Sequence, residues 1–159
     1  MPFIGVITNQ KNENYIREKL KGIFKDDNII FINEKNILNI KNITFETLLI
    51  DGIIKNKIQL NKITEKSKYL VVNNDIESQT SKKKITYGFN NKSTFTVSSI
   101  DEKNIIICLQ SNIFNKNEEE IEPQEFKIEN NENVDKYAII GTGIVKILYD
   151  INRHKNNKF

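Results

Sequence analysis

The sequence has few of the residues on which most catalytic and metal sites depend. It contains one cysteine, Cys108, one histidine, His154, and no tryptophan. A single cysteine excludes an internal disulfide, and the shortage of both residue types excludes a zinc site built from cysteine and histidine. A magnesium site made only of oxygen ligands stays open. Cys108 lies in an apolar run, where we expect a buried thiol that behaves as a small hydrophobic side chain.

Glycine and long apolar runs are also scarce. The six glycines are scattered, and none belongs to a glycine-rich loop before a helix, so the usual phosphate-binding loop is missing. No stretch has the roughly 18 apolar residues of a membrane span. The short apolar run at residues 1–7 has no basic flank and does not resemble a signal peptide. These absences predict a cytoplasmic protein without a membrane span.

The chain does contain nearly balanced charges and enough apolar residues for one core. Its 159 residues include 24 basic and 21 acidic side chains, and 38% of the residues are hydrophobic. This length is typical of one domain. We therefore expect a single domain over residues 1–151, followed by a polar, disordered tail over residues 152–159. The net charge of only +3 argues against a nucleic acid as the partner.

Short apolar runs alternate with amphipathic patterns in the first half of the chain. Strand-length runs lie at residues 3–8, 28–33, 45–50 and 69–73. Helical spacing lies between them at residues 10–24 and 54–66, while residues 35–42 are ambiguous and could make two helical turns. The second of these segments carries Ile54, Ile58 and Ile63 on a basic background, which is consistent with a surface helix. The alternation predicts βαβ units and a mostly parallel sheet that is covered by helices.

The second half of the chain has a different pattern. Four strand candidates follow one another without helices between them, at residues 85–87, 94–98, 105–110 and 125–128. Pro123 makes the last of them either an edge strand or a strand that starts late, and residues 115–120 read as a charged loop. Residues 134–151 form a helix pattern that is apolar around most of its circumference, which indicates a buried helix capped by Asn133.

The predicted fold class is therefore α/β. An N-terminal, mostly parallel βαβ sheet is followed by a small antiparallel section and a buried C-terminal helix. Two glycines lie within that helix, Gly141 and Gly143, where small residues permit close packing against a neighbour.

Several short motifs come in a characteristic order. V-V-N-N-D at residues 71–75 ends a buried strand, and I-T-Y-G at residues 85–88 ends the next. An antiparallel set then precedes a helix that starts at Asn133-Val134. In this order the segment over residues 69–151 resembles the ATP-binding central domain of the Mur ligases, and V-I-T-N at residues 6–9 is similar to another strand end of that family. The resemblance implies that Asn73 and Asp75 lie near a bound nucleotide, with Thr8 and Asn9 at the neighbouring strand end.

The chain departs from that family where the chemistry takes place. The phosphate-binding loop is absent, Gln10-Lys11 replaces the family's Asp-His after the T-N strand, and the substrate-binding C-terminal domain has no counterpart here. We therefore expect a non-catalytic module without a cofactor that acts in binding or assembly, with a protein partner or a second copy of itself. The resemblance links such a module to cell-wall or spore-envelope processes.

Two alternatives stay open. The first is a small nucleotide-binding enzyme or sensor that holds ATP and magnesium at the Asn73 and Asp75 strand end, although Asn73-Asn74-Asp75 could equally be a plain strand cap and turn. The second is a nucleic-acid patch made by Lys82, Lys83 and Lys84, which a solvated loop explains equally well.

Overall fold

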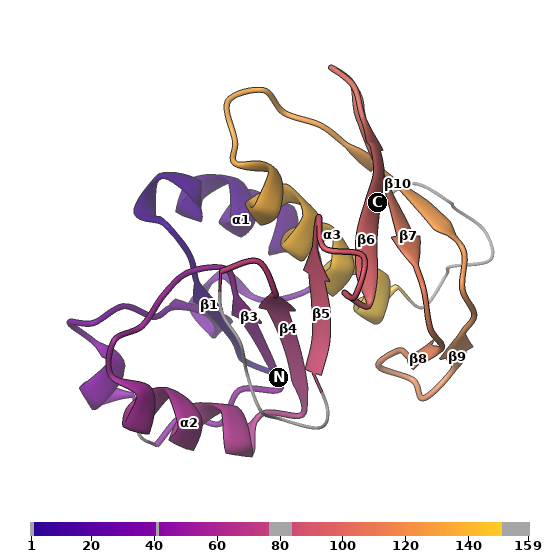
Figure 1. Cartoon of the computed structure of the whole chain (residues 1–159). Helices are drawn as coiled ribbons and strands as arrows, with labels where there is room; N and C mark the ends of the chain where they lie inside the picture. The colour runs from indigo at the N-terminus through magenta and orange to yellow at the C-terminus, as the bar shows by residue number, and fades with distance from the viewer. Residues whose placement is uncertain (1, 41, 77–83, 151–159) are drawn as a thin grey trace.

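The computed structural model describes residues 2–40, 42–76 and 84–150. Its main feature is one eight-stranded sheet with the strand order β10-β7-β6-β5-β4-β3-β1-β2 (Figure 1). The strands of this sheet are β1 (Ile4–Ile7), β2 (Ile29–Phe31), β3 (Thr47–Ile50), β4 (Tyr69–Asn73), β5 (Lys84–Gly88), β6 (Phe95–Ile100), β7 (Asn104–Leu109) and β10 (Glu125–Glu129).

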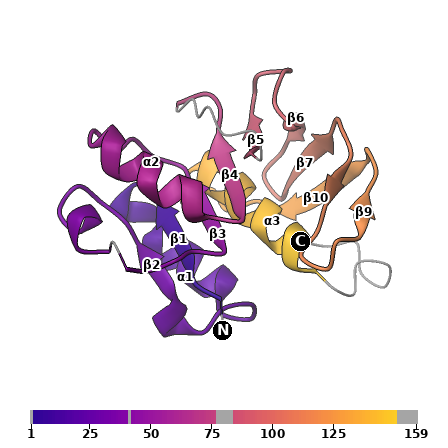
Figure 2. The same cartoon turned by 90° about the horizontal axis from the view of Figure 1, so that it is seen from below.

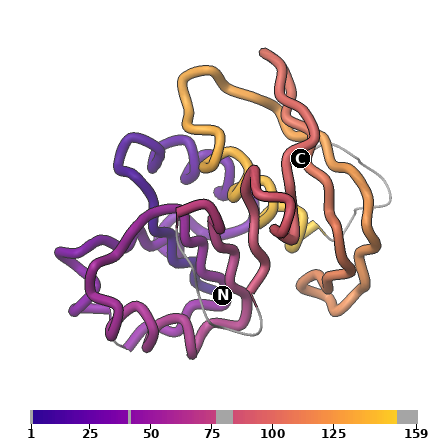
Figure 3. The backbone as a smooth tube through the Cα atoms, viewed as in Figure 1, coloured from indigo at the N-terminus to yellow at the C-terminus, as the bar shows by residue number. Residues whose placement is uncertain are grey.

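The predicted division into a parallel and an antiparallel part is confirmed. Each neighbouring pair from β2 to β6 is parallel. β7 is antiparallel to both of its neighbours, β6 and β10. Both parts belong to the same sheet, and the backbone trace in Figure 3 shows the antiparallel section beside the parallel one. β10 lies at the edge of the sheet, as Pro123 predicts.

Three α-helices cover the sheet from two sides. α1 (Glu13–Leu20) and α3 (Lys136–Tyr149) pack on one face, and α2 (Lys57–Lys66) packs on the other (Figure 2). Short 3-10 helices occur at η1 (Gln10–Asn12), η2 (Asp26–Asn28) and η3 (Ile37–Asn39). Side chains alternate along each strand, so Leu49 of β3 joins the core under α3 while Leu48 and Ile50 join the core under α2.

The second predicted helix is present, but it begins later than residue 54, and Ile58 does not belong to its buried face. The side chain of Asn56 accepts a hydrogen bond from the backbone N–H of Gln59 at 3.2 Å, and this cap starts α2 at Lys57. The buried face of the helix is then made by Leu60, Ile63 and Thr64. Ile54 is buried before the helix begins, and Ile58 is left 71% exposed.

The long C-terminal helix is buried as predicted, but it begins later than its sequence pattern suggests. Asp135, rather than Asn133, is its N-cap and accepts a hydrogen bond from the Tyr137 N–H at 3.2 Å. A β-carbon at Gly141 would lie 2.6 Å from the Tyr87 hydroxyl oxygen, and one at Gly143 would lie 2.5 Å from Ile128 Cδ1. The two glycines therefore allow α3 to lie directly on the sheet, which confirms their predicted role in close packing.

The charged loop predicted at residues 115–120 belongs to a small hairpin. β8 (Ile113–Phe114) and β9 (Glu120–Ile121) pair in an antiparallel manner, and the Asn115 side chain accepts hydrogen bonds from the N–H groups of Asn117 and Glu119. The two strands are only two residues long, which is too short for an alternating sequence pattern to show. The predicted tail over residues 152–159 lies outside the described residues.

Candidate functional site

Four parallel strands end side by side at one edge of the sheet, which we call the carboxyl edge. The register pairs Ile7 with Ile50, Ile50 with Val72, and Asn73 with Tyr87, so the ends of β1, β3, β4 and β5 lie within two residues of the same level. β2 and β3 lie on opposite sides of β1, so the chain changes direction between β1 and β3. In open α/β sheets this switch point is the usual place for a ligand.

Asp51 lies at the centre of the switch point and receives three hydrogen bonds. The Tyr87 hydroxyl donates to Asp51 Oδ1 at 2.8 Å, and the Asn73 side-chain amide donates to the same oxygen at 3.1 Å. The Thr8 hydroxyl donates to Asp51 Oδ2 at 3.1 Å. Asp51 is only 6% exposed, and Asn73 and Tyr87 are fully buried. These four residues form a closed group, which we call the Asp51 network.

Sequence reasoning identified two members of this network and missed the other two. Thr8 and Asn73 were expected at the site, and the structure brings them together through Asp51. Asp51 itself reads as half of an Asp-Gly turn, and Tyr87 reads as a strand residue. A carboxylate directly after a buried strand, as at Ile50-Asp51, is the signal that could have identified Asp51.

Asn73 uses both ends of its side chain inside the protein. Its Nδ2 group donates to Asp51, and its Oδ1 atom accepts the backbone N–H of Asp75 at 3.0 Å. The residue therefore orients the buried carboxylate and also shapes the turn after β4. A nucleotide contact by Asn73 stays a prediction, and because the residue is fully buried, neighbouring groups would have to move before a ligand could reach it.

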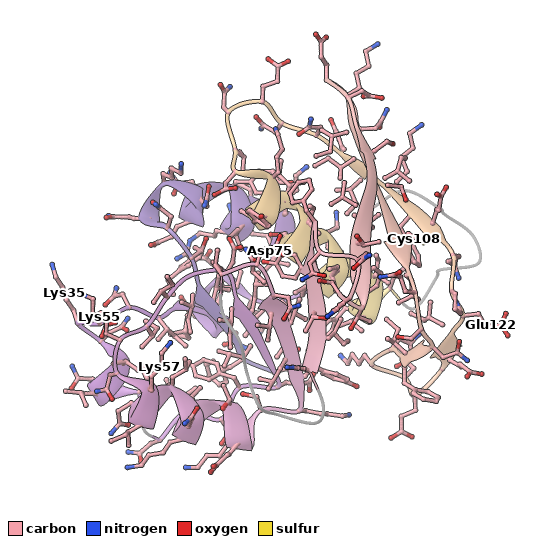
Figure 4. All side chains as sticks on the ribbon, in the orientation of Figure 1. Lys35, Lys55, Lys57, Asp75, Cys108 and Glu122 are labelled. Carbon is pink, nitrogen blue, oxygen red and sulfur yellow. The ribbon has the colours of Figure 1, made fainter. Side chains whose placement is uncertain are left out.

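Asp75 belongs to a second, more exposed cluster at the same edge (Figure 4). Its Oδ2 atom accepts the backbone N–H of Phe89 and the hydroxyl of Tyr137, both at 2.8 Å. The Phe89 and Tyr137 rings meet edge to face, with centroids 5.5 Å apart. A β-carbon at Gly88 would lie 2.7 Å from the Asp75 carboxyl group, so the glycine of the T-Y-G motif makes room for Asp75.

The remaining predicted site residues lie apart from these clusters. Asn9 is exposed, and its side chain accepts the backbone N–H of Lys11 at 3.2 Å, so it caps η1. Lys84 begins β5 and is half-buried, whereas Lys82 and Lys83 lie outside the described residues. Cys108 is half-buried rather than buried, because the alternation of β7 places it on the face away from α3.

Burial determines the protonation of the network. Burial raises the pKa of Asp51 to about 6, although hydrogen bonds from Tyr87, Asn73 and Thr8 oppose the rise. Burial and the neighbouring Asp51 raise the pKa of Tyr87 well above its ordinary value. Burial, followed by the hydrogen bond to Asp75, raises the pKa of Tyr137 to about 12. Both tyrosines therefore keep their protons near neutral pH and act as hydrogen-bond donors.

We expect Asp51 to make the protein less stable as the pH rises from about 4 to about 6. The pKa of its carboxyl group is about 6 in the folded protein, above the ordinary value of 3.8, so the folded state binds this proton more tightly than the unfolded chain does. Two pKa units correspond to about 3 kcal/mol. Urea unfolding of the wild type and of Asp51→Asn over this pH range measures the effect. The difference in unfolding free energy between the two proteins should change by about 3 kcal/mol across this pH range. A difference that stays constant with pH would contradict the raised pKa of Asp51.

The described residues offer limited chemistry for catalysis or metal binding. Residues 2–40, 42–76 and 84–150 contain no group of three or more His, Cys, Asp or Glu side chains that could hold a metal ion. At the carboxyl edge the donors and acceptors are carboxylates, hydroxyls and amides, and most of them are already bonded to one another. Such an arrangement holds a structure or binds a polar ligand more readily than it activates a nucleophile.

No protein-family model matches this chain, and a search of characterised proteins found no match. In the part of the chain that the structure describes, no helix is both long and apolar enough to cross a membrane.

Proposed function

We propose that this chain is a non-catalytic, Mur-ligase-like module that acts in assembly. The observation that carries the proposal is the Asp51 network, which fills the switch point of the sheet with the protein's own side chains. Each oxygen of the buried carboxylate already accepts a hydrogen bond from Thr8, Asn73 or Tyr87. The carboxylate and its three donors are thus already paired with one another, and a ligand that displaced one of these bonds would incur about 1–3 kcal/mol for the group left unpaired.

The connection after β1 supports the same conclusion. Only Thr8 and Asn9 separate β1 from η1, and neither is a glycine. The Lys11 N–H already donates a hydrogen bond to the Asn9 side chain, so it is not free to bind a phosphate. A phosphate-binding loop needs several glycine-rich backbone N–H groups that point at the ligand, and this connection is too short to supply them.

Exposed apolar side chains at the carboxyl edge favour a protein as the partner. Ile53, Ile76 and Phe89 follow β3, β4 and β5, and they are 64%, 41% and 50% exposed. Apolar side chains gathered at one place on a surface are typical of protein interfaces. The net charge of only +3 does not oppose contact between two copies, so we take a second copy of the chain as the occupant. The link to cell-wall or spore-envelope processes depends on the Mur ligase resemblance alone.

Sedimentation equilibrium tests the assembly half of the proposal. We expect the wild type to self-associate with increasing concentration, and the double variant Ile76→Ser/Phe89→Ser to weaken this association at least ~tenfold, as for residues at the centre of an interface. The matched control is Ile58→Ser/Phe114→Ser, which removes two side chains of similar type that are exposed elsewhere. A wild type that stays monomeric, or equal losses in both double variants, would overturn a second copy as the partner.

The nucleotide alternative has one observation in its favour. Asp75 Oδ1 has no hydrogen bond within the described residues, and the Phe89 ring next to it is half exposed. A carboxylate beside an open aromatic ring could accept the hydroxyls of a ribose while the base stacks on the ring.

Calorimetry with magnesium-ATP separates the two functions. For the non-catalytic module we expect no hydrolysis and no binding heat that depends on Asp75. Micromolar binding that is lost in Asp75→Ala, together with turnover in the wild type, would establish the nucleotide-binding alternative instead. Asp75→Asn keeps an acceptor for Tyr137 and Phe89, so it reveals whether any loss in Asp75→Ala comes from the ligand or from the fold.

A further inference from the structure

A separate cleft of about 730 Å³ opens on the face of the sheet that carries α1 and α3. One wall is formed by Tyr15 and Lys19 of α1 and by Lys146 of α3. The other is formed by β10 and by the turn between β6 and β7, and this turn supplies Lys103. The cleft shares no residue with the Asp51 network or with the Asp75 cluster. Its volume is in the range of sites that hold small organic molecules.

The floor of the cleft is apolar and depends on Gly143. A β-carbon at this position would lie 2.5 Å from Ile128 Cδ1, so the glycine lets α3 sit directly against β10. Ile128 and Ile139 line the same cleft. The Ile128 side chain of β10 therefore packs against the backbone of α3 at Gly143, and this close packing fixes the position of the two elements that border the cleft.

Positive charge dominates the rim. Four lysines line the cleft against two glutamates, Glu102 and Glu129. Residues 2–40, 42–76 and 84–150 contain ion pairs at Arg17–Asp26 and Lys21–Glu18, and none of the four cleft lysines has an ion pair within 4.0 Å. Lys19 and Lys146 line the same wall without an ion pair to a carboxylate of the described residues, and such an excess of positive charge attracts an anion.

Two further groups in the cleft are suited to bind such an anion. Partial burial lowers the pKa of Lys146, and Lys19 lowers it further, so an anion placed between these two ammonium groups would relieve their repulsion. Burial raises the pKa of Tyr15 to about 12, with a smaller contribution from Glu129, so its hydroxyl stays protonated. That hydroxyl makes no hydrogen bond within the described residues and can donate to a ligand.

We propose that this cleft binds a small organic phosphate that carries hydroxyl groups. Lys19, Lys146 and the Tyr15 hydroxyl would bind the phosphate oxygens by charge-assisted hydrogen bonds. Glu129 would accept a hydroxyl of the organic part, which would lie against the apolar floor. The cleft is too large for a bare phosphate ion to fill, and the two glutamates on its rim would repel the continuous negative charge of a nucleic acid.

The test titrates ¹⁵N-labelled protein with glycerol 3-phosphate and glucose 6-phosphate and follows the amide signals of Gly143 and Lys146. Glycerol and glucose are the uncharged controls, and inorganic phosphate is the bare anion. We expect saturable shifts with the two organic phosphates, weaker binding of inorganic phosphate, and no shifts with the uncharged compounds. No shifts with either organic phosphate at about 10 mM would overturn the proposal, because a site of three charge-assisted hydrogen bonds binds more tightly than this.

Matched lysine variants locate the binding. Lys146→Met keeps the apolar stem of the side chain and removes the ammonium group, so binding should weaken at least ~tenfold. Lys19→Met, at an exposed position of α1, should also weaken it and remains informative if Lys146→Met fails to fold. Lys35→Met removes the same charge at the end of the molecule opposite β10 (Figure 4) and should leave binding unchanged.

The remaining outcomes separate this proposal from the proposed function. If inorganic phosphate binds as tightly as the organic phosphates, the cleft holds an adventitious ion only, and the proposal fails. Equal weakening by Lys35→Met would also overturn it. Asp75→Ala should leave organic phosphate binding intact, and any heat of ATP binding that survives in Asp75→Ala but disappears in Lys146→Met belongs to this cleft rather than to the carboxyl edge.

Discussion

Replacing Asp51 by alanine should destabilise the fold by about 3 kcal/mol, since it leaves several buried donors without an acceptor. The Tyr87 hydroxyl and the Asn73 amide both donate to Asp51 Oδ1 and are fully buried, so neither reaches water when the carboxylate is removed. Thr8 is only half-buried and contributes less. Part of the loss is offset, because the variant no longer buries a charged group near neutral pH. Urea unfolding at about pH 7 measures the change.

Asp51→Asn is the matched control for this loss. The asparagine keeps an oxygen that can accept from Tyr87 and Asn73, it is almost the same size, and it carries no charge to bury. We expect it to be at least as stable as the wild type at neutral pH, because it keeps an acceptor for the buried donors and avoids the cost of ionising a buried carboxyl group. If Asp51→Ala and Asp51→Asn were equally stable, the hydrogen bonds of the network would contribute little, and the proposal that it closes the switch point would lose its main support.

Gly141→Ala is the second substitution for which we expect a large effect, a net loss of about 2 kcal/mol. Its new methyl group would lie 2.6 Å from the Tyr87 hydroxyl oxygen and 2.8 Å from Leu49 Cδ1, so α3 or the sheet must move. Overpacking of this kind costs about 1–3 kcal/mol, and here the crowded hydroxyl is held by Asp51, which favours the upper part of that range. The higher helix propensity of alanine offsets at most about 1 kcal/mol of this cost. Thermal and urea unfolding report the difference.

Gly22→Ala provides the comparison for that experiment. A β-carbon at Gly22 meets no atom within 4 Å, so the same chemical change there should leave stability unchanged or raise it slightly. Combining Gly141→Ala with Tyr87→Phe removes the crowded oxygen. The double variant should therefore lose less stability than the sum of the two single losses, by roughly 1 kcal/mol. Simple additivity would show that the contact between α3 and Tyr87 does not limit the packing.

The two glycines of α3 connect the two sites of the protein. Gly141 lets the helix approach the Asp51 network, and Gly143, two residues later, lets it approach β10 and so shapes the cleft. One helix therefore positions both regions from its buried side. We expect a substitution at Gly141 to disturb the Asp51 network, because it crowds Tyr87. We expect a substitution at Gly143 to disturb the cleft, because it crowds Ile128.

The sequence by itself determined the class of fold and several of its elements. Runs of apolar residues separated by amphipathic stretches specify buried strands and surface helices, and β4 occupies Tyr69–Asn73 as predicted. The nearly continuous apolar pattern of α3 specified a buried helix. These properties are local, since each depends on residues a few positions apart, and local periodicity is what a single sequence displays most clearly.

Other local features were decided by capping and length rather than by periodicity. Ile58 matches the helical spacing of its neighbours, yet the Asn56 cap sets the start of α2 and leaves Ile58 in solvent. The hairpin of β8 and β9 is too short for an alternating pattern to be visible. In both cases one hydrogen bond or turn outweighs the hydrophobic pattern.

Only the tertiary structure decided which polar groups meet. Tyr87 lies 36 positions from Asp51, and Thr8 lies 43 positions from it, so no spacing rule connects them. Strand order and register place the ends of β1, β3, β4 and β5 within two residues of one level and bring Thr8, Asn73 and Tyr87 around one carboxylate. The lysine cleft has the same origin, since it exists only where α1, α3 and β10 come together. Periodicity shows which face of each element is buried, but the long-range contacts between elements determine its neighbours.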